Sequence, residues 1–160
     1  MTSGGLGRDD LGFLLAKAMQ RWNELLADSF AREGYADVRP SYGSVLIPLF
    51  EEDGLQMGEL ARRSRLSKQT MTTLVRRVER DGLVSRRADP GDARATLIFL
   101  TERARAFEPV AAEVLRQLDE AVRSQLDPAA VASLKEALGE LTALELRASP
   151  AGRSRAPAGR

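Results

Sequence analysis

The sequence contains no cysteine and no histidine among its 160 residues. Without cysteine there are no disulfide bonds, no thiolate redox sensing and no cysteine-based metal sites. Without histidine, a frequent zinc ligand and the commonest general base are missing as well. We therefore expect a protein that works without cofactors or a transition-metal site.

Long apolar runs are also missing. The longest, Val45 to Phe50, is far shorter than the roughly 20 residues that a membrane-spanning helix needs. The first ten residues have neither the basic start nor the apolar stretch of a secretory signal. Hydrophobic residues make up 43% of the chain and charged residues 29%, which is typical of a globular protein with a buried core. We expect a cytoplasmic protein without a membrane partner.

Positive charge is concentrated in the middle of the chain, although the formal net charge is only +1. Residues 59–94 hold ten lysines and arginines against five acidic residues, whereas residues 1–58 hold five against nine. Binding to phosphates depends on the local potential rather than on the total charge. The middle segment therefore favours a phosphate-binding surface, and an ordinary solvated helical surface is the alternative that charge alone leaves open.

Hydrophobic periodicity predicts a mainly helical chain with one β-hairpin. Apolar residues recur at helical spacing, and Ser67, Thr101 and Asp127 are suitable N-caps. Pro48 and Pro109 are expected to bend the helices that contain them. The predicted helices are 9–33, 40–52, 57–63, 67–81, 101–125 and 127–147, and the predicted strands are 83–86 and 96–100, joined by a turn at 89–92.

A short helix, a turn, an amphipathic helix and a hairpin follow one another between residues 57 and 100, which is the order of a winged helix-turn-helix. The apolar residues of its second helix are spaced for burial on one side. They are Met71, Leu74, Val75 and Val78. The opposite side then presents Lys68, Gln69, Thr72, Thr73 and Arg76.

This polar side suits the major groove of DNA. Glutamine can bond to adenine, threonine can contact the methyl group of thymine, and arginine can pair with guanine or phosphate. Ser67 and the backbone N–H groups that follow it can bind a phosphate. On a lone helix the same residues would be read as a solvated surface, and the attached hairpin favours DNA binding.

From Leu55 to Arg105 the sequence resembles the DNA-binding lobe of the MarR family of bacterial transcriptional regulators. An Asp-x-Arg wing tip followed by a strand that ends in Leu-Thr is the most specific match. Two positions depart from the family pattern, because Arg65 and Ala104 stand where glycine is common. The shared segments include Glu59-Leu60-Ala61, Leu66-Ser67, Thr70, Leu74-Val75, Glu79, Gly82-Leu83-Val84, Arg86, Asp92-Ala93-Arg94 and Leu100-Thr101.

The resemblance implies a mainly α fold with a small β-hairpin wing. Residues 40–101 would form the winged helix-turn-helix lobe, and residues 9–39 and 102–147 a helical dimerisation region. Composition predicts a flexible N-terminus at 1–8 and a disordered tail at 148–160. A homodimer would bind a pseudo-palindromic operator whose half-sites lie about 34 Å apart.

The implied activity is sequence-specific binding to double-stranded DNA as a transcriptional regulator, with repression as the expected mode. The resemblance implies that Arg94 reaches the minor groove and that Asp92 braces the wing through an arginine. An inserted arginine is attracted by the concentrated negative potential of a narrow minor groove. The expected DNA-binding residues are Ser67, Lys68, Gln69, Thr70, Thr72, Thr73, Arg76, Arg86, Asp92 and Arg94.

Members of the family often respond to small aromatic or anionic effectors bound between the helical base and the lobe. In this chain that region would be lined by Trp22, Leu26, Tyr42, Leu46 and Phe107. Residues at such helical spacing also form plain core, so both interpretations stay open.

Two other function classes are alternatives for such a sequence. A winged helix can serve protein–protein assembly without specific DNA binding, but Lys68, Arg76 and Arg80 on the second helix argue against that alternative. An enzyme is not expected, because the sequence has no G-x-S-x-G motif, no P-loop and no histidine.

Overall fold

The computed structural model describes residues 7–144. It divides into two compact units, one that ends at Leu118 and one that begins at Asp119. Within the described residues, no helix combines the length and the apolar character that crossing a membrane requires.

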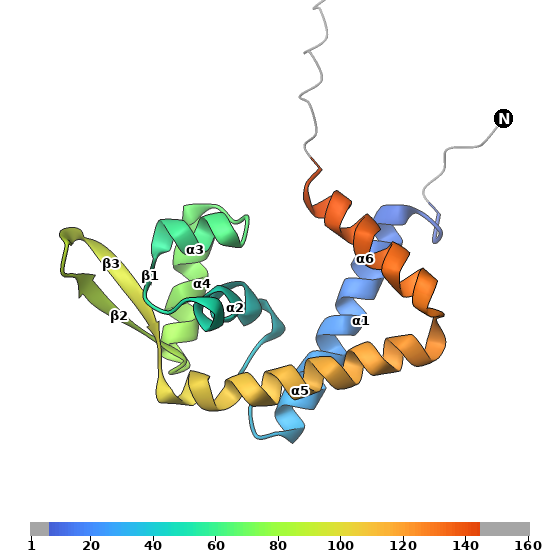
Figure 1. The fold of residues 1–160 in the computed structure, drawn as a ribbon, viewed down its shortest axis with the longest axis horizontal. Helices are drawn as coiled ribbons and strands as arrows, with labels where there is room; N and C mark the ends of the chain where they lie inside the picture. Colours follow the sequence, from blue (N-terminus) through green and yellow to red (C-terminus); the bar gives the residue numbers. More distant parts are fainter. Residues whose placement is uncertain (1–6, 145–160) are drawn as a thin grey trace, which may run out of the picture. The chain divides into compact units, whose positions relative to one another are not determined.

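The first unit is helical with a small sheet, as predicted (Figure 1). The long helix α5 begins in this unit and continues into the second. The helices are α1 (Leu11–Arg32), the 3₁₀ turn η1 (Pro40–Tyr42), α2 (Gly43–Glu51), α3 (Met57–Arg63), α4 (Lys68–Arg80) and α5 (Glu102–Gln125). The strands are β1 (Leu55–Gln56), β2 (Val84–Asp89) and β3 (Asp92–Leu100).

The ends of α1 and α4 follow from local chemistry. Asp10 caps α1, since its carboxylate accepts the backbone N–H of Gly12 at 2.9 Å. Ser67 caps α4 by accepting the N–H of Thr70 at 3.1 Å. Both helices end just before a glycine with positive φ, Gly34 at 88° and Gly82 at 74°, which is the conformation that terminates helices. The predicted bounds of both helices are confirmed to within two residues.

Neither of the two helix-internal prolines breaks its helix. The predicted helix 40–52 becomes the 3₁₀ turn η1 followed by α2, which continues through Pro48. Proline cannot donate to the carbonyl four residues earlier, and here the Ser64 hydroxyl donates to that carbonyl, on Ser44, at 2.5 Å. This replacement explains how α2 tolerates the proline. Helix α5 likewise runs without a break through Pro109.

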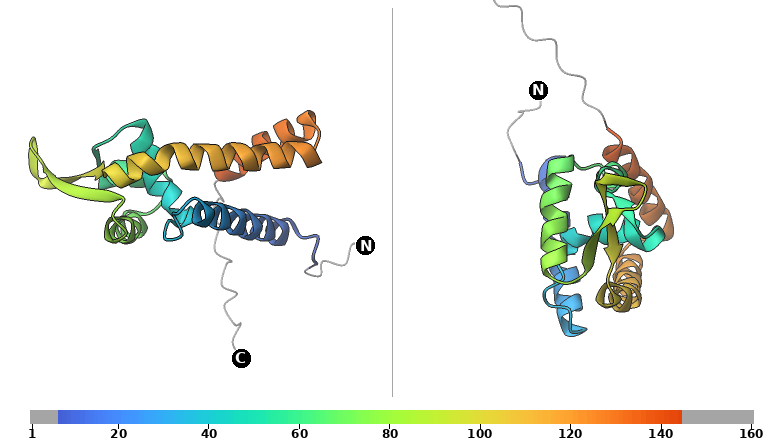
Figure 2. Two further views of the ribbon diagram at one scale, coloured as in Figure 1. Left: turned by 90° about the horizontal axis from the view of Figure 1, so that it is seen from below. Right: turned by 90° about the vertical axis from the view of Figure 1, so that its left-hand side faces the viewer.

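The sheet has three antiparallel strands in the order β1-β3-β2, one more strand than predicted. Strand β1 is only two residues long and pairs Leu55 with Ile98, so it has no periodicity that a sequence could reveal. The hairpin is also longer than predicted, since β2 and β3 extend to Asp89 and Asp92 and leave only two residues in the turn. It projects beyond the helices of its unit (Figure 2).

The core of the first unit lies where α4 meets α2, α3 and the sheet. Each large apolar side chain buried there contributes roughly 1.5–3 kcal/mol. On α4, Met71, Val75 and Val78 are fully buried as predicted, but Leu74 is only half-buried. The fully buried residues include Tyr42, Val45, Leu60, Met71, Val75, Val78, Leu83 and Ile98.

The second unit holds the end of α5 and helix α6 (Pro128–Thr142). Asp127 caps α6 as predicted, accepting the N–H of Ala130 at 2.9 Å. Helix α6 ends at Thr142, and the last residues of the predicted helix 127–147 lie outside the described residues. The predicted tail 148–160 and most of the predicted flexible N-terminus also lie outside them.

Candidate nucleic-acid interface

The outward side of α4 carries two adjoining rows of polar side chains at i, i+4 spacing. One row is Lys68, Thr72 and Arg76, and the next is Gln69, Thr73 and Arg77. All are exposed except Thr72, which is half-buried, and neither row contains an acidic residue. The predicted residues of this helix are therefore brought together on one surface that is free of opposing charge.

The two threonines are held in fixed rotamers by their own helix. Thr72 Oγ1 donates to the carbonyl of Lys68 at 2.8 Å, and Thr73 Oγ1 donates to the carbonyl of Gln69 at 3.1 Å. Because the hydroxyl hydrogens are used inside the helix, each side chain offers a methyl group and an acceptor oxygen to a ligand. A thymine methyl group or a base amino group is the matching chemistry.

The start of α4 has donors available for a phosphate, but they are not the Ser67 hydroxyl. That hydroxyl is engaged in the cap, where it accepts from Thr70 N and donates to Thr70 Oγ1 at 2.8 Å. The first backbone N–H groups of a helix have no partner within the helix. Ser67 and Thr70 therefore position the start of α4, and the N–H groups of the residues just after Ser67 are the ones that point outward.

The turn before α4 contains Arg65, at the position where the family pattern usually has glycine. Its φ is 51°, and it is the one described non-glycine residue with positive φ. This left-handed conformation costs an L-residue roughly 1–2 kcal/mol. The backbone thus keeps the geometry that glycine would adopt freely, and Leu66 N still donates to Ala61 O at 3.0 Å.

The wing presents Arg94 as an exposed side chain on β3 near the hairpin turn. Within the described residues, Asp92 has no arginine side chain as a partner, unlike the brace that the resemblance implied. Instead its carboxylate accepts the backbone N–H of Arg94 at 2.9 Å, because a short Asp side chain reaches the N–H two residues ahead. Asp89 likewise accepts Gly91 N, and Gln56 Nε2 donates to Asp89 at 3.0 Å. These bonds stiffen the turn that carries Arg94.

Arg86 is less available to DNA than predicted, because it forms an ion pair with Glu79 of α4. Its Nε donates to Glu79 Oε2 at 2.9 Å, and a second nitrogen donates to the same oxygen. This hydrogen bond lowers the pKa of Glu79 below its ordinary value. Arg86 therefore ties β2 to α4 and positions the wing against the helix.

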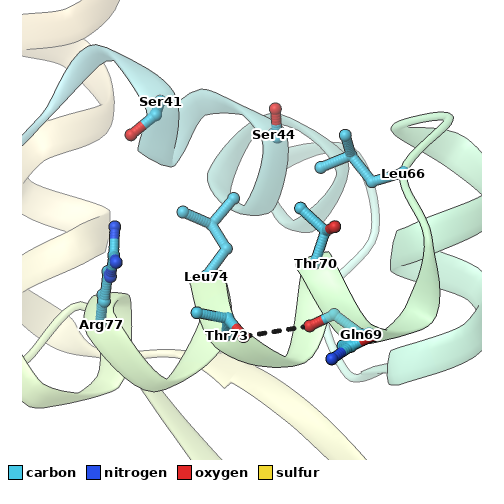
Figure 3. A pocket seen from close by; sticks show the side chains of 8 residues that line it. All are labelled: Ser41, Ser44, Leu66, Gln69, Thr70, Thr73, Leu74 and Arg77. Atoms are coloured by element: carbon cyan, nitrogen blue, oxygen red, sulfur yellow. Dashed lines mark hydrogen bonds between the residues drawn. The ribbon is translucent and has the colours of Figure 1, made fainter.

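Arg77 is a candidate that the sequence-based reasoning missed. It lies at one end of a groove of about 530 Å³ between α4 and the η1–α2 segment (Figure 3). Its spacing of four residues from Thr73 is the signal that would have included it. The residues that line this groove are Ser41, Ser44, Leu66, Gln69, Thr70, Thr73, Leu74 and Arg77.

A second cavity of about 90 Å³ coincides with most of the predicted effector site. Its lining includes Leu26, Tyr42, Leu46 and Phe107, but not Trp22. Trp22 is only partly buried at the edge of the core, because it lies one helical turn before Leu26. The cavity is smaller than the 300–1,000 Å³ usual for ligand pockets, so these residues are mainly core in the present conformation.

The wall of this cavity is connected to the end of α4. Tyr42 is fully buried and its hydroxyl donates to the Asp81 carboxylate at 2.5 Å. Burial first, and then the bond to Asp81, raises the pKa of Tyr42. The pKa of Asp81 is lowered by Arg80 and by Tyr42. Asp81 is the C-cap residue of α4, so this bond joins the wall of the cavity to the end of the outward-facing helix.

Residues 40–96, which contain α2 to α4 and most of the wing, match the model of the MarR family. The chain is 41% identical over 64 residues to the HTH-type transcriptional regulator TtmR of Methylorubrum extorquens, a match over 40% of this chain and 33% of TtmR. It is 36% identical over 78 residues to the HTH-type transcriptional repressor Rv2887 of Mycobacterium tuberculosis, which covers 49% of this chain and 56% of that protein.

Among solved structures, a probable transcriptional regulator from Pseudomonas aeruginosa is similar over most of the chain. It has a TM-score of 0.73 at 27% identity, over 83% of this chain and 97% of that one. The matches to curated relatives are shorter, since the chain spans only about a third to just over half of their length. The likeness is therefore strongest in the segment that carries α4 and the wing.

Proposed function

We propose that this chain, whose residues 40–96 match the model of the MarR family, is a transcriptional regulator of that family that inserts α4 into the major groove of duplex DNA. The observation that carries the proposal is the outward side of α4, where basic and hydroxyl side chains are exposed without an acidic residue. Lys68, Gln69, Thr72, Thr73 and Arg76 meet the base edges.

The wing supplies the second contact, with Arg94 in the adjacent minor groove. Its guanidinium has no hydrogen bond or ion pair within residues 7–144, and the turn that carries it is held by Asp89 and Asp92. Because the turn is already held, binding has to order the arginine side chain but not the backbone that carries it. Ser67, Thr70, Arg86 and Asp92 act indirectly, by positioning α4 and the wing.

The protein acts as a homodimer through the regions 9–39 and 102–147. The first half of α1 has five large apolar side chains that are 36–61% exposed, and contiguous exposure of this kind marks an interface. They are Leu11, Phe13, Leu14, Leu15 and Met19. Two-fold symmetry requires a pseudo-palindromic operator with half-sites about one helical turn apart, ~34 Å.

Repression is the proposed mode, in keeping with the similarity to the mycobacterial repressor. A small aromatic or anionic effector would enlarge the cavity around Leu26, Tyr42, Leu46 and Phe107. Through the Tyr42–Asp81 hydrogen bond it would shift the population of dimers away from the conformation that fits DNA.

The test is a titration of the full-length protein against its own upstream intergenic DNA and against an unrelated duplex, at several salt concentrations. We expect preferential binding to the upstream DNA, weakened by salt. Arg94→Ala should lower affinity for that DNA by about 1–3 kcal/mol. The matched control is Arg32→Ala, which removes an exposed arginine at the end of α1, outside the lobe.

Equal and weak binding to both duplexes, unaffected by Arg94→Ala, would contradict sequence-specific regulation. It would favour the alternative in which the winged helix serves protein–protein assembly.

A further inference from the structure

The groove between α4 and the η1–α2 segment contains polar groups that base recognition does not use. We propose that this groove seats the sugar-phosphate backbone of one DNA strand, and that Arg77 binds a phosphate there, with the Ser41 and Ser44 hydroxyls as further donors. The inference rests on the proposed function, since duplex DNA is the ligand. It adds a backbone-binding site beside the base-reading face.

The groove has two walls that face each other. From the α4 side, Thr70, Leu74 and Arg77 point toward the η1–α2 segment, which carries Ser41 and Ser44 (Figure 3). Its volume of about 530 Å³ is several times that of the cavity near Tyr42. It is open to solvent along the same side of α4 that carries Gln69 and Thr73, so an extended ligand can enter from the proposed DNA side.

The donors in this groove are unoccupied within residues 7–144. The Arg77 guanidinium and the hydroxyls of Ser41 and Ser44 have no hydrogen bond or ion pair there, and the lining has no acidic residue. Arg80 and Arg86 differ from Arg77, since Arg80 is paired with Asp81 and Arg86 with Glu79. Arg77 is thus a cation left available at a concave surface.

The protein groove is positioned to face one of the two sugar-phosphate strands that border the DNA major groove. When a helix enters the major groove, one row of residues faces the bases and its flank faces a sugar-phosphate strand. With Lys68, Thr72 and Arg76 toward the bases, Gln69 and Thr73 lie at the edge of the base-reading face, and Arg77, one turn after Thr73, lies on its flank. The eight residue steps from Gln69 to Arg77, at 1.5 Å each, make this row about 12 Å long.

The lining chemistry also matches a DNA strand, in which apolar sugar faces alternate with anionic phosphates. Leu66 and Leu74 give the groove an apolar surface beside the hydroxyls and Arg77. Leu74 has the spacing of the buried stripe of α4 but remains half-buried, and the proposed site accounts for its exposed part. A deoxyribose would cover it.

The experiment uses the same two duplexes and salt series with Arg77→Gln. Because a phosphate contact carries no sequence information, affinity for both duplexes should fall by the same factor, about tenfold. The slope of log affinity against log salt should become shallower by about 0.9. Arg77→Lys should restore most of both quantities, and Arg32→Gln is the matched control, with thermal melting by circular dichroism to verify the fold.

A second arm identifies the phosphate. Uncharged methylphosphonates are placed one at a time along each strand of the upstream duplex. One position is expected at which the substitution weakens wild type about tenfold and has no further effect on Arg77→Gln. Absence of such a position, or an unchanged salt slope in Arg77→Gln while wild type binds DNA, would overturn the groove site alone. Wild type that binds neither duplex would overturn the proposed function itself.

Discussion

At the scale of single residues, the loop before β1 depends on Gly54. Its φ is 76°, and a Cβ there would lie 2.7 Å from Cε1 of the Phe99 ring. The Arg87 guanidinium lies 4.7 Å from the centroid of this ring, so moving the ring away would disturb that cation–π contact as well. Gly54 is therefore required both for its backbone conformation and for the space that Phe99 occupies.

Gly54→Ala should destabilise the protein by about 2–4 kcal/mol, since the cost of positive φ adds to that of overpacking. Gly34→Ala is the matched control, because its φ is 88° but nothing lies within 4 Å of the added Cβ. The control should lose only about 1–2 kcal/mol. Urea unfolding of both variants measures the difference, and equal losses would contradict the role of Phe99.

At the scale of elements, α3 is held by an ion cluster around Glu59. Its carboxylate accepts from Arg62 Nε at 2.8 Å and from Arg63 Nε at 2.7 Å, and Arg63 also pairs with Glu52 next to α2. The bonds to Arg62 and Arg63 lower the pKa of Glu59 from 4.5 to about 2. A lowered folded-state pKa stabilises the protein above the unfolded value.

The contribution of Glu59 should therefore be complete above pH ~5 and disappear as the pH falls from about 4.5 to 2. Glu59→Gln should lower stability at pH 7 and flatten the loss of stability across that window. The control is Glu108→Gln, which removes an exposed carboxylate without an ion pair in the described residues. Unfolding by urea at a series of pH values tests this, and parallel pH profiles of wild type and Glu59→Gln would be the contradicting result.

The elements also differ in how far local sequence predicts them. The bounds of α3 were predicted to the residue, and those of α4 to within one, because apolar spacing, a serine cap and a terminal glycine all act within a few residues. Strand β1 was missed, since its two residues become a strand only by pairing with β3, more than 40 positions away.

At the scale of the whole molecule, the exposed apolar side chains in the first half of α1 predict that the chain associates with a second copy. Leu14→Arg, at a side chain 50% exposed, should weaken self-association by placing a charge where a second copy buries apolar surface. Light scattering after size exclusion should show a smaller species at micromolar concentration, and DNA binding should weaken with it.

Gln20→Arg is the control for this prediction, because Gln20 is also exposed and lies at least 100° around the same helix from Leu11, Leu14, Leu15 and Met19. A change of mass in Gln20→Arg, or an unchanged mass in Leu14→Arg, would contradict dimerisation through this face.

The residues of the candidate interface also differ in how far local sequence predicts them. The outward row from Lys68 to Arg76 was predictable, because the buried positions of one helix settle which side chains point away from it. The engagement of Arg86 with Glu79 was not, since the two come from different elements. The bond from Asp92 to the backbone of Arg94 involves only two residues, yet the resemblance pointed to a side-chain partner instead.

Local sequence alone thus suffices for the helices, their caps and the polar face of α4, because hydrogen bonds and apolar spacing within a few residues decide them. Tertiary structure decides which of those groups remain available. Among residues 7–144, Arg77 has no ion pair and lies beside a groove, while Arg86 is paired with Glu79. Tyr42 is hydrogen-bonded to Asp81 across 39 positions of the chain. Such pairings depend on how distant segments pack, and the long-range contacts that create them leave no periodic signal in the sequence.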